Sequence, residues 1–210
     1  MTARLLDRDR LAVPAPAAAR DLLGAVLEVD SPQGTVAVQL SEVEAYAGLA
    51  DPASHAYRGR TPRNAVMFGP PGFLYVYFVY GMHWCCNVVC GPAGEASAVL
   101  LRAGRVVTGV AAARARRPAA RTEAELARGP ARLAAALGID RAANGADLLD
   151  PGSAVRLRAG GPVPAAAVRT GPRVGVAAAG DVPWRLWVAD DPTVSAYRPG
   201  VRRARRAPVH

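Results

Sequence analysis

Two kinds of hydrophobic spacing follow one another near the start of the chain. Residues 15 to 27 place apolar side chains at helical intervals after two prolines, which predicts an amphipathic helix that Gly24 ends. From residue 35 the spacing changes to strict alternation, which is typical of a half-buried β-strand. The apolar side of this predicted strand carries Val36, Val38 and Leu40.

Two carboxylates lie on the continuation of this strand. If the alternation persists, Glu42, Glu44 and Tyr46 share the apolar side with Leu40. An ionised carboxylate on an apolar face is costly unless it is paired or faces a wet cavity, so we expect the strand to open into a cleft near Glu44. A β-bulge that turns both glutamates to solvent accounts for the same residues equally well, and the strand alone does not separate the two interpretations.

The next two segments predict a loop and a hairpin. Residues 47–72 are rich in Gly and Pro and predict a long ordered loop, a feature that is usually functional inside a compact domain. Residues 73–89 contain two β-rich runs that meet near Gly81, which predicts a β-hairpin. On this hairpin Tyr75 and Tyr77 share one face, and Tyr80 lies at the turn.

The second half of the chain is less regular. We expect a strand from Val99 to Arg102, an exposed connection over residues 111–128 and a helix over residues 129–138 with Pro at its first turn and Gly at its end. Residues 150–171 contain only short strand-like pieces. The domain therefore spans residues 1–200, and residues 201–210 form a basic C-terminal tail that either adds affinity for nucleic acid or serves solubility alone.

Composition narrows the class of partner. The formal net charge is +9 and the pI is about 10.4, which favours a polyanion such as nucleic acid, although a surface tuned for solubility gives the same charge. All 26 basic side chains are Arg, and the sequence contains no Lys. Because Arg cannot act as an amine nucleophile, lysine-based Schiff-base chemistry is excluded.

Cysteine usage and hydropathy exclude further classes. Cys85, Cys86 and Cys90 lack the paired spacing of a structural zinc site, and we expect them to be small buried hydrophobes. No run of residues is apolar enough for a membrane span, and the first ten residues lack the apolar stretch of a signal peptide. These features predict a cytoplasmic protein without a metal site.

Several blocks in order along the chain resemble the alkyladenine, or 3-methyladenine, family of DNA glycosylases. One block alone would be a weak signal, but their order is specific. They are Glu42-Val-Glu44-Ala-Tyr46, Asp51-Pro-Ala-Ser-His55, Thr61-Pro-Arg63-Asn64, Met67-Phe68-Gly69, Tyr75-Val-Tyr77 with Tyr80-Gly81-Met82, Asn87, Leu101-Arg102-Ala103, Gly129-Pro130, Asn144-Gly145, Arg173-Val-Gly175 and Pro183-Trp-Arg185.

The resemblance implies roles for individual residues. Glu44 matches the family's general base, and Arg102 matches a residue that orients the water or the adjacent phosphate. The base pocket would contain Tyr46, His55, Tyr77 and Asn87. The side chains that enter the DNA would be Tyr80 and Met82, and those that contact its backbone would be Thr61 and Arg63.

The resemblance also implies a fold and an activity. The fold would be α/β in a single domain, with a curved, mostly antiparallel sheet flanked by helices and a protruding hairpin that intercalates into DNA. The activity would be monofunctional: a damaged purine is flipped from duplex DNA and its glycosidic bond is hydrolysed by a monomer that needs no cofactor. Two alternatives remain open, a glycosidase acting on free nucleosides or carbohydrate and a non-catalytic protein that binds distorted DNA.

Overall fold

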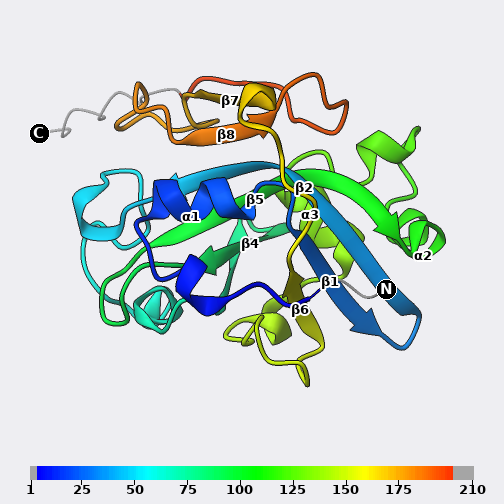
Figure 1. The fold of residues 1–210 in the computed structure, drawn as a ribbon, viewed down its shortest axis with the longest axis horizontal. Helices are drawn as coiled ribbons and strands as arrows, with labels where there is room; N and C mark the ends of the chain where they lie inside the picture. Colours follow the sequence, from blue (N-terminus) through cyan, green and yellow to red (C-terminus); the bar gives the residue numbers. More distant parts are fainter. Residues whose placement is uncertain (1–3, 201–210) are drawn as a thin grey trace, which may run out of the picture.

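One β-sheet organises the molecule, for which a computed structural model describes residues 4–200 (Figure 1). The predicted basic tail, residues 201–210, lies outside the described residues. The helices are α1 (Ala15–Leu22), α2 (Val110–Arg116) and α3 (Pro130–Leu137), and the strands are β1 (Val26–Ser31), β2 (Gly34–Tyr46), β3 (Leu74–Val79), β4 (His83–Val89), β5 (Ala98–Thr108), β6 (Val155–Arg158), β7 (Val168–Gly171) and β8 (Arg185–Val188).

The sheet divides at its longest strand. Its main path is β3-β4-β5-β2-β1-β6, and every pairing is antiparallel. One edge of β2 pairs with β5 over most of its length, whereas the other edge pairs first with β1 and then with β8. Strands β7 and β8 therefore form a separate branch, drawn in orange tones above the rest of the sheet in Figure 1. The predicted α/β fold with a mostly antiparallel sheet is confirmed.

A pair of bulges lies at the point where β2 changes partners. Leu40 pairs with Gly104 and Glu42 with Ala103, so Ser41 is an extra residue on β2. Val43 then pairs with Leu101, so Arg102 is an extra residue on β5. Each extra residue reverses the alternation of its strand. Val43 and Ala45 consequently join the same core as Leu40, and Glu42 and Glu44 lie on the opposite side.

Both interpretations of the glutamates were thus wrong in part. We predicted that Leu40, Glu42 and Glu44 lie on one side of the strand. This is wrong, because the bulge at Ser41 reverses the alternation between Leu40 and Glu42. The alternative, a bulge that exposes both carboxylates to solvent, predicted the bulge and missed the burial: both side chains are fully buried. On the side of β2 that carries them, Arg185 from the neighbouring strand β8 and Ser195 from the segment after it bond Glu42.

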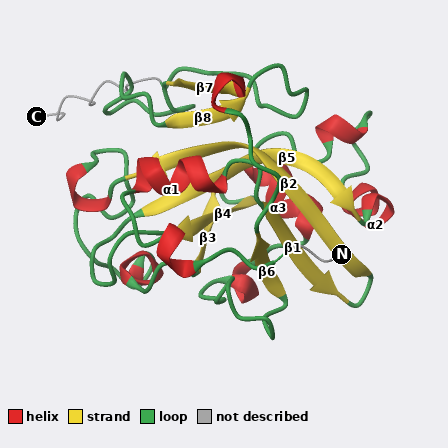
Figure 2. Ribbon diagram, viewed as in Figure 1, coloured by secondary structure: helices red, strands yellow, loops and turns green. Residues whose placement is uncertain are grey.

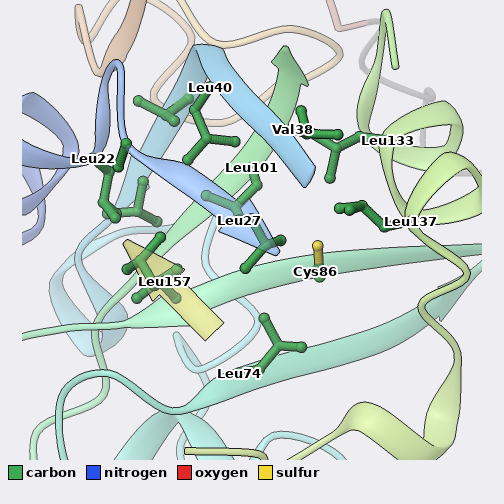
Figure 3. Packing of buried hydrophobic residues seen from close by; sticks show 14 of the residues in the cluster. Leu22, Leu27, Val38, Leu40, Leu74, Cys86, Leu101, Leu133, Leu137 and Leu157 are labelled. Carbon is green, nitrogen blue, oxygen red and sulfur yellow. The ribbon is translucent and has the colours of Figure 1, made fainter. Parts of the chain in front are cut away.

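The hydrophobic core fills the other side of the sheet. Helices α1 and α3 each contribute one apolar face to it, through Leu22 on the first and Leu133 and Leu137 on the second. Figure 3 shows these leucines on opposite sides of strand residues that include Val38 and Leu101. The core fixes the sheet in place, and with it the positions of the buried carboxylates.

Two predicted elements differ from the structure. The helical spacing of residues 15–27 extends past the observed α1, which ends at Leu22 just before Gly24. This glycine, which was predicted to end the helix, turns the chain with φ +85°, and Val26 already pairs in β1. Residues 111–128 are not a plain exposed connection. They contain most of α2, and Ala113 and Leu126 are fully buried against the core. Small alanine side chains allow this close packing, although the many arginines nearby suggest a surface segment.

The loop and the hairpin follow the sequence pattern. Residues 47–72 contain no strand and only two 3-10 turns, Gly48–Ala50 and Ala65–Phe68, within the long stretch of loop drawn in green in Figure 2. Strands β3 and β4 pair from Leu74 with Val88 to Val79 with His83, as predicted. At the turn, Tyr80 and Gly81 both have positive φ, +53° and +68°. The predicted helix at 129–138 is confirmed as α3, with Gly138 in the left-handed conformation at its end.

Candidate active site

Glu44 is fully buried near the end of β2 and is held by hydrogen bonds. Its Oε1 accepts a hydrogen bond of 2.6 Å from the backbone N–H of Val174, and its Oε2 accepts one of 2.9 Å from the hydroxyl of Tyr46. Arg102 Nη1 lies 3.4 Å from the same Oε2. Burial raises the pKa of the Glu44 carboxyl, and these three partners oppose the rise. The group is therefore more basic than an ordinary glutamate.

A cleft of about 330 Å³ opens beside Glu44. Its walls bring together most of the residues that the sequence analysis selected: Glu44, Tyr46, His55, Tyr77, Tyr80 and Arg102. A smaller hollow of about 70 Å³ shares Tyr46, His55 and Tyr77 with the cleft and adds Asn87 and Tyr75. The two hollows form one aromatic recess, because the same three rings line both. The predicted cleft near Glu44 is confirmed.

Ring contacts fix the shape of this recess. Tyr75 and Tyr77 stack with their centroids 5.7 Å apart, on one face of the hairpin as predicted. His55 meets Tyr77 edge-on at 4.6 Å, and its Nδ1 lies 3.1 Å from the Tyr75 hydroxyl. Burial lowers the pKa of the His55 imidazole, and the nearby charge of Arg63 lowers it further. A neutral imidazole at neutral pH places no positive charge beside a bound ligand.

The remaining residues of the predicted site lie around this recess. Asn87 is buried on β4 and donates from Nδ2 to the Tyr75 carbonyl at 3.1 Å. Tyr80 and Met82 stand at the hairpin tip, with 87% and 67% of their surfaces exposed. Arg63 lines a separate groove on the hairpin's flank, and its positive charge opposes the rise that burial causes in the pKa of Tyr75. Thr61 is exposed in a turn, where its Oγ1 accepts from the Asn64 backbone N–H at 3.4 Å.

Sequence reasoning assigned no role to a second set of buried residues. Arg173 is buried and bonds both oxygens of Asp51, at 2.5 and 2.9 Å, and the carbonyl of Ala45 at 2.9 Å. Its guanidinium also lies over the rings of Tyr46, at 4.6 Å, and Trp184, at 5.2 Å. Arg173 thus supports Tyr46 from behind and places the N–H of Val174 against Glu44. Asp51 and Arg173 both belong to the sequence blocks that carry the family resemblance. Their pairing was not predictable, because residues so far apart in the chain form no local sequence pattern.

Glu42 is the other buried carboxylate whose surroundings the sequence did not indicate. Its Oε1 accepts from Arg102 Nε at 2.8 Å, from Arg185 Nε at 2.7 Å and from the Ser195 hydroxyl at 2.9 Å. Its Oε2 accepts from the Ser195 backbone N–H at 2.7 Å. Two arginines and one serine therefore enclose Glu42 and leave no side of it open to the cleft.

The described part of the chain gives no indication of a metal centre or a membrane span. Within residues 4–200, no group of three or more His, Cys, Asp or Glu side chains is arranged to hold a metal ion. The three cysteines are free and buried, as predicted, and burial raises the pKa of the Cys90 thiol to about 11. No helix among these residues is long and apolar enough to cross a membrane.

Comparison with known proteins agrees with this geometry. The model of the family described as methylpurine-DNA glycosylase (MPG) matches residues 9–192. A protein of Streptomyces avermitilis, provisionally named a 3-methyladenine DNA glycosylase, is 56% identical over 203 residues, which are 96% of this chain and 95% of that protein. Similarly named proteins of Nocardia farcinica and Mycobacterium tuberculosis are 56% identical over 205 residues (95% of this chain and 93% of theirs) and 50% identical over 209 residues (97% and 98%). The chain belongs to the methylpurine-DNA glycosylase family and is a DNA glycosylase of DNA repair.

Proposed function

We propose that this enzyme removes 3-methyladenine and other alkylated or deaminated purines from duplex DNA, using Glu44 to activate the attacking water. The observation that carries the proposal is a fully buried carboxylate of raised pKa beside an aromatic recess. A base inside a duplex cannot reach such a recess, so the damaged nucleotide is rotated out of the helix before reaction. The relatives' names support 3-methyladenine as one substrate.

The chemical step needs one carboxylate. Glu44 takes a proton from the water, the water oxygen forms a bond to the anomeric carbon, and the bond from that carbon to the purine nitrogen breaks. The electron pair of the broken bond goes to the purine, which leaves as a neutral base if alkylation had made it cationic. A neutral lesion such as hypoxanthine takes up a proton from solvent as it leaves. Arg102, 3.4 Å from Glu44, helps to place the water or the neighbouring phosphate.

The aromatic recess selects the base. Alkylation at a ring nitrogen makes the purine cationic, and the faces of Tyr46 and Tyr77 attract a cation by roughly 0.5–2 kcal/mol. Neutral His55 adds a flat surface without charge repulsion. Asn87, fixed by its bond to the Tyr75 carbonyl, discriminates against normal guanine. We expect 3-methyladenine, 7-methylguanine, hypoxanthine and ethenoadenine as substrates.

The hairpin tip holds the DNA open. Tyr80 is exposed at a tight turn and is the wedge that fills the gap left by the flipped base, with Met82 beside it. Thr61 and Arg63 contact the DNA backbone, and the net charge of +9 adds affinity that does not depend on sequence. We expect a monomer that acts in the cytoplasm, at the nucleoid.

The reaction ends at the abasic site. Glycosylases that also cut the strand form a Schiff base between an amine and the sugar, and the chain has no lysine. We therefore expect an intact abasic strand after incubation with a duplex that carries hypoxanthine or 3-methyladenine. A covalent adduct trapped by borohydride would contradict this part of the proposal.

The decisive variant is Glu44→Gln, which keeps the shape of the side chain and removes its basicity. We expect the rate of base release to fall by at least about 10³-fold, because the variant cannot take the proton from the attacking water. The dissociation constant for the lesion duplex should change by less than about threefold, because the shape of the pocket is retained. The matched control is Glu95→Gln, which changes an exposed carboxylate outside the cleft. Undiminished release by Glu44→Gln would sink the proposal, and release from free nucleosides as fast as from duplex would indicate a nucleosidase instead.

A further inference from the structure

Arg102 lies between the buried carboxylates of Glu42 and Glu44 and contacts Glu42 more closely than Glu44. Its Nε bonds Glu42 at 2.8 Å and its Nη2 bonds the Ser195 hydroxyl at 3.0 Å. Its contact with Glu44 is through Nη1, which lies 3.4 Å from Oε2. The guanidinium therefore directs its hydrogen bonds toward Glu42 and Ser195 and meets Glu44 through one longer ion-pair contact.

The structure assigns to Glu42 a positioning role in the reaction: it holds Arg102 away from a side-on pair with Glu44 and so leaves Glu44 able to take a proton from water. This inference rests on the proposed function, since it concerns how Glu44 stays basic. Glu42 itself touches neither the cleft nor the substrate, because four donors from Arg102, Arg185 and Ser195 surround it.

The alternative arrangement explains why such restraint is needed. A guanidinium presents two parallel N–H groups that match the two oxygens of a carboxylate, and that bidentate pair is the strongest contact an arginine makes. If Arg102 paired with Glu44 in this way, the lone pairs needed for the water proton would be occupied. Glu42 and Ser195 prevent this by occupying the Nε and Nη2 groups.

The charges near Glu44 give the expected direction of change. Arg102 and the more distant Arg173 favour its ionised form, Glu42 disfavours it, and the hydroxyls of Tyr46 and Tyr77 are un-ionised because burial raises their pKa. Replacing Glu42 with Gln removes a like charge and weakens the hold on Arg102, because a neutral amide oxygen accepts from a guanidinium less strongly than a carboxylate does. Both changes lower the pKa of Glu44 and make it a weaker base.

The test is the pH dependence of single-turnover release of 7-methylguanine from duplex DNA. This base is already cationic, so the rise of the rate with pH reports Glu44 and not protonation of the leaving group. For Glu42→Gln we expect the rise to move to lower pH and the plateau rate to fall about 10- to 100-fold, with the dissociation constant for the lesion duplex changed less than about threefold.

Glu28→Gln is the matched control, because Glu28 also accepts from two arginines, Arg156 and Arg158, on a distant part of the sheet. It should leave both the rise and the plateau unchanged. Ser195→Ala removes the hydroxyl that bonds both Glu42 and Arg102 and retains every charge. In this variant the increase of the release rate with pH should move in the same direction as in Glu42→Gln, by a smaller amount. If Glu42→Gln does not fold, Ser195→Ala tests the positioning role in its place.

An unchanged profile and plateau in Glu42→Gln, or a rise that moves to higher pH, would overturn the positioning role. The same applies to an unchanged profile in Ser195→Ala. These failures are distinct from failure of the proposed function, which is decided by Glu44→Gln. If Glu44→Gln is inactive while Glu42→Gln behaves as wild type, Glu44 keeps its role and Glu42 loses its own.

Discussion

The two sides of β2 are equally buried and chemically opposite. On one side, Val43 and Ala45 are fully buried in the hydrophobic core. On the other, Glu42 and Glu44 are fully buried among arginine side chains, Ser195, the Tyr46 hydroxyl and backbone N–H groups. Residues of both kinds alternate within one short segment of a single strand.

The difference between these sides separates stability from chemistry. The apolar side stabilises the fold because burying a hydrophobic side chain removes its surface from water, at about 25 cal/mol per Å². The polar side costs free energy to desolvate, and its hydrogen bonds and ion pairs offset that cost only while every partner is present. We infer that the polar side is retained for reaction, and the following variants test this division in order of decreasing effect.

The largest effect should come from breaking the buried pair behind Tyr46. Arg173→Met leaves Asp51 buried without its cation, and we expect a loss of about 3–5 kcal/mol in the free energy of unfolding. Urea denaturation measures this loss. The exposed Arg169→Met should change stability by less than about 0.5 kcal/mol. A loss in Arg173→Met as small as this control would mean that the polar side tolerates an unpaired charge.

On the apolar side, Leu40→Ala should cost about 2–5 kcal/mol, because it removes a fully buried side chain from the core. The rate of base release per folded molecule should stay within about twofold, since Leu40 faces away from the cleft. Urea denaturation and single-turnover release measure the two quantities on the same sample. The half-exposed Val107→Ala is the control for stability. A large loss of rate in folded Leu40→Ala would show that the two sides are not separable.

Tyr80→Ala should lower activity and leave stability unchanged. Stacking of a base on an aromatic ring is worth about 1–3 kcal/mol, so we expect release from duplex to fall about 10-fold or more. The side chain is 87% exposed, and its loss removes no core contact. Single-turnover release compares it with Met82→Ala at the same tip, for which we expect a smaller effect. If Tyr80→Ala releases the base from duplex DNA at the wild-type rate, Tyr80 is not the wedge.

The smallest effect concerns the stability of Glu44→Gln as a function of pH. Burial raises the folded-state pKa of Glu44 above its ordinary value of 4.5, so the stability tied to its neutral form is complete below about pH 4.5 and is lost as pH rises through the folded pKa. Gln has no such loss. Glu44→Gln should therefore gain stability relative to wild type as pH rises above about 4.5 and through the folded-state pKa of Glu44, as followed by urea denaturation at each pH. A constant difference across this range would contradict the raised pKa.

The sequence predicted those features of the fold that a local pattern determines. Alternation located β2, the Tyr80-Gly81 turn located the hairpin, and Pro130 with Gly138 bounded α3. The extra residue at Ser41 was not predictable from alternation, because it depends on where β2 exchanges β1 for β8. The same limit applies to residues 25–27, whose helical spacing continues past Gly24, because pairing of Val26 with two neighbouring strands places it in β1.

The sequence predicted which residues lie together at the candidate site, but it did not predict the hydrogen bonds and ion pairs that hold them there. Recognised blocks indicated Glu44, Tyr46, His55, Tyr77 and Arg102, and the fold brings them to one cleft. The contacts that hold them come from far along the chain: Val174 to Glu44, Arg173 to Asp51, and Ser195 to Glu42. Such pairings arise from the packing of β8 and the segments beside it on β2, which no single stretch of sequence encodes.

The central claim is that Glu44 activates a water for direct attack and does not itself bond to the sugar. Carrying out the reaction in a water–methanol mixture lets methanol replace water, and the anomer of the methylated product in the DNA strand records the face of attack. Attack opposite the departing base inverts the β configuration of the deoxynucleotide, so we predict the α anomer. Formation of the β anomer would contradict the claim, because retention indicates a covalent intermediate on Glu44.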